Sequence, residues 1–509
     1  MRKILVVLLI ILSIGVTAQI TFQKTFGGIS YGNDRSYCVQ QTSDGGYIIA
    51  ATIDSFGAGA SDVYLIKTNN IGDTLWTKTF GGINDDVGYS VQQTTDGGYI
   101  VVGYTTSFGA GNADVYLIRT DSIGDTVWTK TFGGINSEQG YSVQKTADGG
   151  YIIAGGTSSF GAGSVDVYLI KTDNNGDTLW TKTIGGTDYD YAYSIKQTTD
   201  SGYIIVGTNG NVLLIKTNSI GDTLWTKYFL NGNAGEGIAV QQTYDSGYII
   251  AGTYHNSAMK SSNGFLIKTD NIGDTLWTKF FGGGGSHDNF NSVQQTTDGG
   301  YIIGGGGEMD SHLIKTDSSG NVLWSNAFGQ ASPALACYSV EQTTDGGFII
   351  ITGPTYGAVI YLIKTDSNGR SGCNELTPDI WTTPPSTLVG IPAMSVSSSP
   401  TIVTTPATIT GSGGIVNTLC FSSGTGEIAD NKYSVLLFPN PTTNTFTIKN
   451  TSSKEKTLLE ITNVFGEIVY TEKLFGKNEY IVNLNLSEGI YFVRVSDAES
   501  NIVRKLIVE

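Results

Sequence analysis

Three histidines are the side chains of this chain best suited to acid–base or metal chemistry, and carboxylates are their sequence neighbours. The set consists of His255, His287, Asp288, Glu308, Asp310 and His312. A histidine–carboxylate cluster can bind a metal ion or transfer protons. The spacings match no metal-binding motif, however, and His312 occupies a slot that Tyr64 fills in an earlier copy of a repeat. Incidental surface histidines are therefore the favoured interpretation.

Acidic loops suggest a second kind of site, because carboxylate oxygens are ligands for Ca²⁺. The acids concerned are Asp85, Asp86, Asp188 and Asp190. They lack the Asp-x-Asp-x-Asp-Gly spacing of a strong calcium motif, so solvated turn acids are favoured over a calcium site. The sequence contains no Gly-x-Ser-x-Gly elbow, no His-Glu-x-x-His, no phosphate loop and no Cys-x-x-Cys. We therefore predict no catalytic residue, and no cofactor apart from the calcium that these loops leave open.

These residues lie in a chain that repeats itself seven times. In one copy, residues 89–94 read Tyr-Ser-Val-Gln-Gln-Thr, an Asp-Gly-Gly turn follows, and residues 99–103 and 115–120 are apolar. The aromatic residue after this turn recurs at intervals of 45 to 53 residues. Each copy holds four runs of strand length, rich in Tyr, Ile, Val and Thr and separated by Gly and Asp turns. Four strands in about 50 residues is the size of a propeller blade.

The two ends of the repeat array predict a closed ring. A tryptophan marks the fourth strand of six copies: Trp76, Trp128, Trp180, Trp225, Trp277 and Trp324. The seventh copy stops after Gly369 without this strand, whereas residues 20–28 resemble it, with Phe22 in the tryptophan slot. An N-terminal strand that completes the last blade would leave no free sheet edge between the ends. We therefore predict an all-β fold, a seven-bladed β-propeller of four-stranded blades over residues 19–370.

The tryptophan segment also carries a resemblance. Its Gly-Asp-Thr-Leu-Trp run, as in residues 72–76, resembles the tryptophan-docking motif of quinoprotein-type propellers, and the array is similar to kelch-like repeat propellers. The resemblance implies a fold in which each indole packs between adjacent blades as a structural wedge. It carries no quinone-site residue to this chain.

The N-terminus has the pattern of a secretory signal peptide. Arg2 and Lys3 precede an apolar run over residues 4–16, and Val-Thr-Ala at residues 16–18 is typical of a cleavage site. We predict a signal peptide over residues 1–18 and a mature chain from Gln19, with no later stretch able to cross a bilayer as a helix. The net charge of −16 argues against nucleic acid as a partner.

Residues 371–431 lose the repeat and are rich in Ser, Thr and Pro. We predict an extended linker or a small non-globular appendage on the ring. Cys373 and Cys420 bracket this stretch, and in an oxidising compartment we expect a disulfide between them. Cys38 and Cys337 align two positions apart in their copies, and we expect buried free thiols there.

Residues 432–509 form a separate β-rich module. It contains Pro-Asn-Pro at 439–441, Phe-Gly at 465–466, a Leu-x-x-Gly-x-Tyr strand at 486–491 and a basic-apolar strand at 503–508. In the order and spacing of these features it resembles the type A C-terminal sorting domain of the type IX (Por) secretion system of Bacteroidota. The resemblance implies a small β-sandwich, contact with that secretion machinery, and export through the periplasm to the outer cell surface or the medium. An ordinary β-sandwich binding domain is the alternative.

The loops predict where a ligand binds. The Asp-Gly-Gly and Gly-Asp-Thr turns, on one face of a propeller, are nearly identical between copies, whereas the second-to-third and fourth-to-first loops on the other face vary. Function commonly lies on variable loops over a rigid scaffold. We predict a non-catalytic secreted or cell-surface protein that binds a glycan or another surface macromolecule. The alternatives are an extracellular polysaccharide hydrolase or lyase that uses the histidine–carboxylate set, and a structural or adhesive protein.

Overall fold

The chain divides into two compact units, Met1–Gly424 and Thr425–Glu509. The predicted signal peptide, Glu308 and Cys373 lie outside the residues that the structure describes. The computed structural model describes residues 19–27, 34–230, 234–256, 261–282, 287–307, 310–328, 335–354 and 359–372, together with strands and a few flanking residues between 375 and 508.

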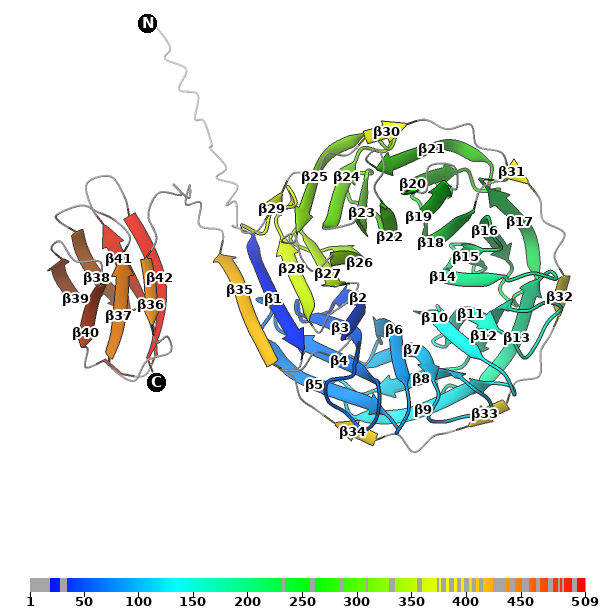
Figure 1. The fold of residues 1–509 in the computed structure, drawn as a ribbon, viewed down its shortest axis with the longest axis horizontal. Coiled ribbons are helices and arrows are strands. Elements are labelled where there is room, and N and C mark those ends of the chain that lie inside the picture. The colour runs from blue at the N-terminus through cyan, green and yellow to red at the C-terminus, as the bar shows by residue number, and fades with distance from the viewer. Residues whose placement is uncertain are drawn as a thin grey trace, which may run out of the picture. The chain divides into compact units, whose positions relative to one another are not determined.

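The first unit is a ring of seven antiparallel four-stranded sheets, the blades (Figure 1). Blade 1 consists of β2 (Arg35–Gln41), β3 (Tyr47–Ile53), β4 (Asp62–Thr68) and β5 (Thr74–Gly81). Blade 2 consists of β6 (Asp86–Gln93), β7 (Tyr99–Thr105), β8 (Asp114–Thr120) and β9 (Thr126–Gly133). Blade 3 consists of β10 (Glu138–Lys145), β11 (Tyr151–Thr157), β12 (Asp166–Thr172) and β13 (Thr178–Gly185). Blade 4 consists of β14 (Tyr191–Gln197), β15 (Tyr203–Thr208), β16 (Val212–Thr217) and β17 (Thr223–Phe229). Blade 5 consists of β18 (Gly235–Gln242), β19 (Tyr248–Asn256), β20 (Ser261–Thr269) and β21 (Thr275–Gly282). Blade 6 consists of β22 (Asn289–Gln295), β23 (Tyr301–Gly306), β24 (Ser311–Thr316) and β25 (Val322–Phe328).

Blade 7 joins the two ends of the repeat array. It consists of β26 (Leu335–Gln342), β27 (Phe348–Pro354), β28 (Ile360–Thr365) and the N-terminal β1 (Ile20–Gly27). Strand β1 pairs antiparallel with β28, so that Phe22 lies opposite Lys364. The predicted fold and its closure by the N-terminal strand are therefore confirmed.

Residues after the ring add a fifth strand to every blade. Seven strands follow blade 7: β29 (Glu375–Leu376), β30 (Trp381–Thr383), β31 (Val389–Gly390), β32 (Ser395–Ser397), β33 (Ile402–Thr404), β34 (Ile409–Gly411) and β35 (Ile415–Ser423). They pair with the outermost strands of blades 6, 5, 4, 3, 2, 1 and 7 in that order, so the chain travels once around the rim against the blade order (Figure 1). We call these seven strands the strap. The sequence predicted a linker or a small non-globular appendage here, whereas the structure shows short strands that cover sheet edges.

The interior of the ring lies between blades. In β3 and β4 every residue is buried, which explains why these segments are apolar without alternation. One apolar cluster contains Ile48 and Leu65 of blade 1 together with Val101 and Ile118 of blade 2. Because each blade packs on the next in this way, the ring is held together by a series of similar cores.

A docking pair repeats at the rim of each interface between blades. A Cβ atom on Gly124 would lie 2.7 Å from the Trp76 ring, so the indole of one blade packs directly on a turn glycine of the next. Trp76 also stands edge-on to Tyr99, with ring centroids 5.7 Å apart. Lys78 Nζ lies 2.8 Å from Asp125 Oδ1 of the same neighbouring turn. At the closure, Phe22 packs on Gly72 in the same manner.

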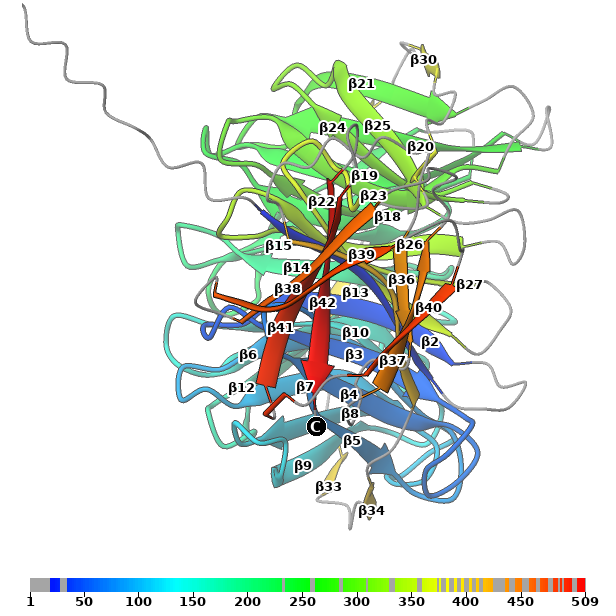
Figure 2. The ribbon, with the colours of Figure 1, turned by 90° about the vertical axis from the view of Figure 1, so that its left-hand side faces the viewer.

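The second unit is built from two sheets. They have the strand orders β36-β37-β40 and β39-β38-β41-β42 and can be followed in Figure 2. Their side chains share one apolar cluster, which includes Phe446 and Val482 of one sheet and Leu459 and Val493 of the other, as a β-sandwich requires. Among the described residues, the structure contains no helix that is long and apolar enough to span a membrane. The strands are β36 (Val435–Phe438), β37 (Thr445–Asn450), β38 (Thr457–Asn463), β39 (Ile468–Leu474), β40 (Glu479–Asn483), β41 (Gly489–Ser496) and β42 (Asn501–Val508).

A candidate binding site in the central channel

The innermost strands of the seven blades surround the ring axis (Figure 1), and the space between them is the central channel. They enclose a cavity of 530 Å³, which every one of these strands helps to line. The strands are β2, β6, β10, β14, β18, β22 and β26. Pockets that bind small ligands typically measure about 300 to 1,000 Å³.

Tyrosines fill one level of this channel. The same position holds a tyrosine in five of the seven inner strands: Tyr37, Tyr89, Tyr141, Tyr193 and Tyr338. Neighbouring rings touch, with centroids 4.8 Å apart for Tyr37–Tyr89, 5.1 Å for Tyr89–Tyr141 and 5.3 Å for Tyr141–Tyr193. We call this set the tyrosine arc. Burial raises the pKa of Tyr37 to about 12, so its phenol keeps its proton and can donate a hydrogen bond.

Glutamines form a ring three residues further along the same strands. The members of this first amide ring are Gln40, Gln92, Gln144, Gln241 and Gln294, with Lys196 and Glu341 at the two remaining positions. The side-chain oxygen of each glutamine accepts the backbone N–H of the next blade, as in Gln93 N to Gln40 Oε1 at 2.8 Å and Gln295 N to Gln241 Oε1 at 2.6 Å. The repeated Gln-Gln pair thus has a structural reason that the sequence analysis missed.

At the following position of the inner strands, the glutamine side-chain oxygen accepts an N–H of the preceding blade instead of the next one. The members of this second amide ring are Gln41, Gln93, Gln197, Gln242, Gln295 and Gln342, with Lys145 in blade 3. Gln93 Oε1 accepts the N–H of Ser43 at 2.8 Å, and Gln242 Oε1 accepts the N–H of Thr199 at 2.9 Å. Two rings of amide hydrogen bonds therefore tie adjacent blades around the channel.

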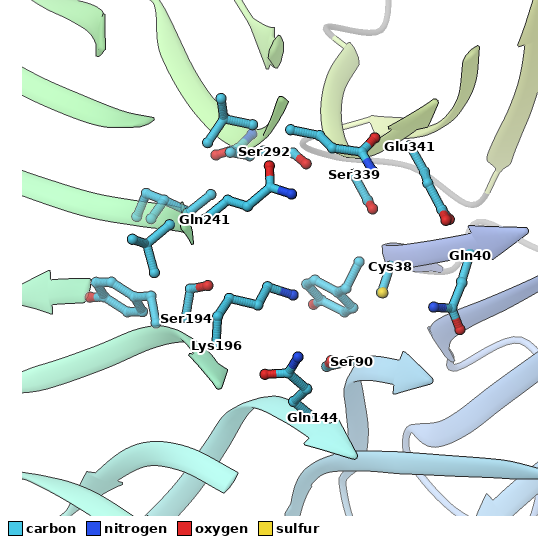
Figure 3. Close-up of a pocket in the computed structure, with 18 of the residues that line it drawn as sticks. Cys38, Gln40, Ser90, Gln144, Ser194, Lys196, Gln241, Ser292, Ser339 and Glu341 are labelled. Atoms are coloured by element: carbon cyan, nitrogen blue, oxygen red, sulfur yellow. The ribbon is translucent and has the colours of Figure 1, made fainter. Parts of the chain in front are cut away.

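Lys196 and Glu341 are the two charged members of the first amide ring, and they behave differently. Glu341 Oε2 accepts the N–H of Gln41 at 2.8 Å, as a glutamine would. Burial raises the pKa of Glu341 to about 7, against the effect of this hydrogen bond and of the Lys196 charge. Lys196 cannot accept a hydrogen bond, and its amine makes no hydrogen bond or ion pair within the part of the chain that the structure describes. Burial lowers the pKa of Lys196, opposed by Cys38 and Glu341. Figure 3 shows its side chain extending into the cavity.

The structure brings only part of the predicted histidine–carboxylate set together. His312 Nδ1 lies 3.9 Å from Asp288 Oδ1, and burial lowers the pKa of His312 against the charges of Asp288 and Asp310. His287 is exposed, with Nδ1 3.4 Å from Ser262 Oγ, and His255 is exposed as well. Over the described residues, no group of three or more His, Cys, Asp and Glu side chains could hold a metal ion.

The predicted acidic loops divide into exposed and buried members. Asp85 and Asp188 are exposed, whereas Asp86 and Asp190 are buried and accept the backbone N–H groups of Gly82 at 2.7 Å and Gly186 at 2.8 Å. Burial raises the pKa of both buried carboxyls. These two aspartates thus hold the loops that contain them.

The cysteines are only partly described. Cys38 and Cys337 are free thiols, as predicted, but only Cys337 is fully buried, and Cys38 is half-buried. Burial raises the pKa of Cys337 to about 12, which makes its thiol unreactive. Cys420 lies on β35, but its expected partner Cys373 is outside the described residues, so the disulfide stays a prediction.

Residues 436–509 match the family described as the secretion system C-terminal sorting domain. This confirms the resemblance found in the sequence over residues 432–509. The chain is therefore exported by the type IX secretion system to the cell surface or the extracellular space, and the C-terminal unit is the part that the secretion machinery handles.

The chain also has more distant likenesses. A regulatory protein, FlaEY of Caulobacter vibrioides, is 26% identical over 178 residues, which are 30% of this chain and 18% of the relative. This chain thus spans less than a fifth of that relative's length. A crystal structure of a protein of unknown function from Bacteroides caccae is 11% identical, with 61% of this chain and 94% of that chain covered and a TM-score of 0.34. Drosophila Plexin A, in complex with Semaphorin 1b, is 9% identical, with 69% and 88% covered and a TM-score of 0.37. The fold of the ring rests on its own strand pairing.

Proposed function

We propose that this exported protein is a non-catalytic saccharide-binding protein and that the central channel is its binding site. The observation that carries the proposal is the 530 Å³ cavity lined by the tyrosine arc and by amide side chains. The aromatic and amide groups come from all seven blades, so the closed ring positions them rigidly.

The lining suits the chemistry of a sugar. A pyranose presents C–H groups that pack on aromatic faces and hydroxyls that donate and accept hydrogen bonds. Tyrosines supply both an apolar ring and a polar tip, and the phenols stay protonated because burial raises their pKa values. Ser90, Ser194 and Asn291 add polar groups to the same cavity.

The test is binding of the full mature chain to a broad glycan array, followed by calorimetry on the strongest ligand. We expect saturable binding by the wild type, and a loss of at least about tenfold in the Y89F/Y141F variant, which removes two phenol hydroxyls from the arc but keeps the rings. The matched control is Y244F, because Tyr244 is 73% exposed on a turn outside the cavity. A folded wild type that binds nothing, or equal binding by both variants, would overturn the proposal.

A further inference from the structure

The seven-fold repeat makes one departure in the channel easy to identify. At the first amide ring, five blades carry glutamine and blade 7 carries Glu341, and all of these have a side-chain oxygen that can accept the N–H of the next blade. Blade 4 carries Lys196 instead, whose ammonium can only donate. Blade 4 therefore lacks the hydrogen bond to the backbone N–H of Gln242 that its position would otherwise make.

Among the residues that the structure describes, the amine of Lys196 has no hydrogen-bond or ion-pair partner that would explain this substitution. The other lysines buried in the blades do: Lys67 Nζ lies 2.8 Å from Asp44 Oδ2, and Lys216 Nζ lies 2.9 Å from Asp200 Oδ2. Charges in protein interiors are paired or hydrogen-bonded as a rule. Lys196 instead lines the 530 Å³ cavity, on the side opposite Cys38 and Gln40 in Figure 3. Its three donors are available to whatever enters the channel.

The chain has a net charge of −16, so a positive group in the channel is a local feature and does not follow from the overall charge. An anion is repelled by the protein at long range, so a site for an anion must rely on a local cation. Lys196 can supply that cation, because a bound anion would oppose the lowering of its pKa by burial, and it lies on the same strand as Tyr193 and Ser194, which also line the cavity.

We infer that the channel binds an acidic saccharide, with the carboxylate of a uronic acid on Lys196 and the sugar ring against the tyrosine arc. This inference rests on the proposed function and names the class of its ligand. An ammonium–carboxylate hydrogen bond is roughly twice as strong as a neutral one. The carboxylate thus supplies the acceptor that Lys196 lacks within the described residues.

Glu341 faces the same cavity and makes the site sensitive to pH. The titratable groups that face Glu341 are Lys196 across the channel, Cys38 on β2 and Tyr47 on β3. Cys38 and Tyr47 are neutral near pH 7, because burial raises both pKa values. Since burial also raises the pKa of Glu341 to about 7, its carboxyl is uncharged below that pH and repels a bound carboxylate above it. Affinity for the acidic ligand should therefore fall as the pH rises from 6 to 8.

The experiment compares two ligands and two variants of the full mature chain. The ligands are a trigalacturonic acid and its methyl ester, which have the same size but differ in charge. K196Q places at this position the glutamine that five other blades carry, so it should fold and restore the hydrogen bond to Gln242. K145Q is the matched control: Lys145 also replaces a glutamine, in the second amide ring, but does not line the cavity.

We expect K196Q to lose at least about tenfold in affinity for the acid, to bind the ester as the wild type does, and to be at least as heat-stable as the wild type. K145Q should bind both ligands normally, and E341Q should abolish the change in affinity for the acid between pH 6 and 8. Equal binding of the acid by K196Q and the wild type would overturn the inference while leaving the proposed function intact. Failure of both ligands and of a sulfated disaccharide to bind the folded wild type would count against the proposed function itself. Binding of the sulfated disaccharide alone, dependent on Lys196, would overturn the assignment to a carboxylate.

Discussion

The two faces of the ring use aspartate in opposite ways. On the face formed by the Asp-x-Gly turns, every blade pairs a turn aspartate with a cation of its third strand; an example is Asp44 with Lys67, whose side chain is only 3% exposed. On the face formed by the longer loops, buried carboxyls of adjacent blades lie beside each other. A Cβ atom on Gly81 would meet Asp62 Oδ1 at 1.9 Å and Asp86 Oδ2 at 2.7 Å.

The same residue type therefore meets opposite electrostatic environments on the two faces, as Asp44 and Asp62 show. Burial alone would raise the pKa of Asp44, but hydrogen bonds from Lys67, Thr42 and Gly46 hold it below its usual value. Burial raises the pKa of Asp62, with Asp86 adding to the shift and hydrogen bonds from Ala58 and Gly59 opposing it. The turn face therefore lowers the pKa of Asp44, and the loop face raises that of Asp62.

The first prediction breaks the ion pair of the turn face. D44N leaves Lys67 buried without its counter-ion, a change that costs about 3 to 5 kcal/mol for a fully buried pair. Because the Asp44 side chain is 54% exposed, solvent screening reduces the expected loss to about 1 to 2 kcal/mol. Guanidinium unfolding of the mature chain at pH 7, followed by tryptophan fluorescence, measures it. The control D85N removes an exposed carboxylate of the loop face and should change the free energy of unfolding little. Equal stability of D44N and wild type would contradict a stabilising role of the Asp44–Lys67 pair.

The second prediction makes the same substitution on the loop face and expects the opposite sign. D62N should stabilise the ring by about 1 kcal/mol at pH 7, because Asp62 Oδ1 is a buried atom that has no hydrogen-bond partner within the described structure. An amide at position 62 would donate a hydrogen bond to Asp86. Its oxygen would still accept the N–H of Ala58, which lies 2.7 Å from Asp62 Oδ2 in the wild type. The chain carries this arrangement already in blade 5, where Asn263 lies beside Asp288 at Gly282. A less stable D62N would indicate instead that the ionised pair holds a cation.

A pH series sharpens the contrast between the two variants. The raised pKa of Asp62 means that its stabilising contribution is present in acid and is lost as the pH rises through that pKa, so the advantage of D62N should grow from pH 4 to pH 7. The lowered pKa of Asp44 means the reverse: its contribution is present at neutral pH and is lost as the pH falls through that pKa. Unfolding free energies of wild type, D44N and D62N from pH 3 to 7 measure both slopes. Parallel curves for the three proteins would show that neither pKa shift couples to folding.

The sequence predicted the ring well because its repeat carries the packing information. The tryptophan, the turn glycine and the apolar runs recur in register, and Phe22 stands in the empty tryptophan slot, so both blade number and closure could be read. The strap could not, because its strands are short, as in Glu375–Leu376 and Val389–Gly390, and pair through backbone groups that no side-chain pattern reveals.

The candidate site was also missed, although a signal for it was present. The loop variation predicted a ligand on the variable face, and the Gln-Gln pair was given no role. Aligning the seven copies would have shown that Lys196 and Glu341 depart from glutamine at one inner position. In a repeat protein, residues shared by all copies reflect packing, and positions where one copy departs from the others are candidates for function.

The smallest expected effect concerns calcium on the loop face. Asp86 and Asp190 already accept backbone N–H groups, and burial raises the pKa of both carboxyls, so each carboxyl has a hydrogen-bond partner without a cation. A site saturated at a hundred times its dissociation constant would stabilise the protein by about 2.7 kcal/mol. We therefore expect the melting temperature of the mature chain to be the same in excess calcium and in excess chelator at pH 7. A shift of several degrees, abolished in D86N, would instead establish the acidic loops as calcium sites and would explain the loop-face carboxyl pairs as ligands.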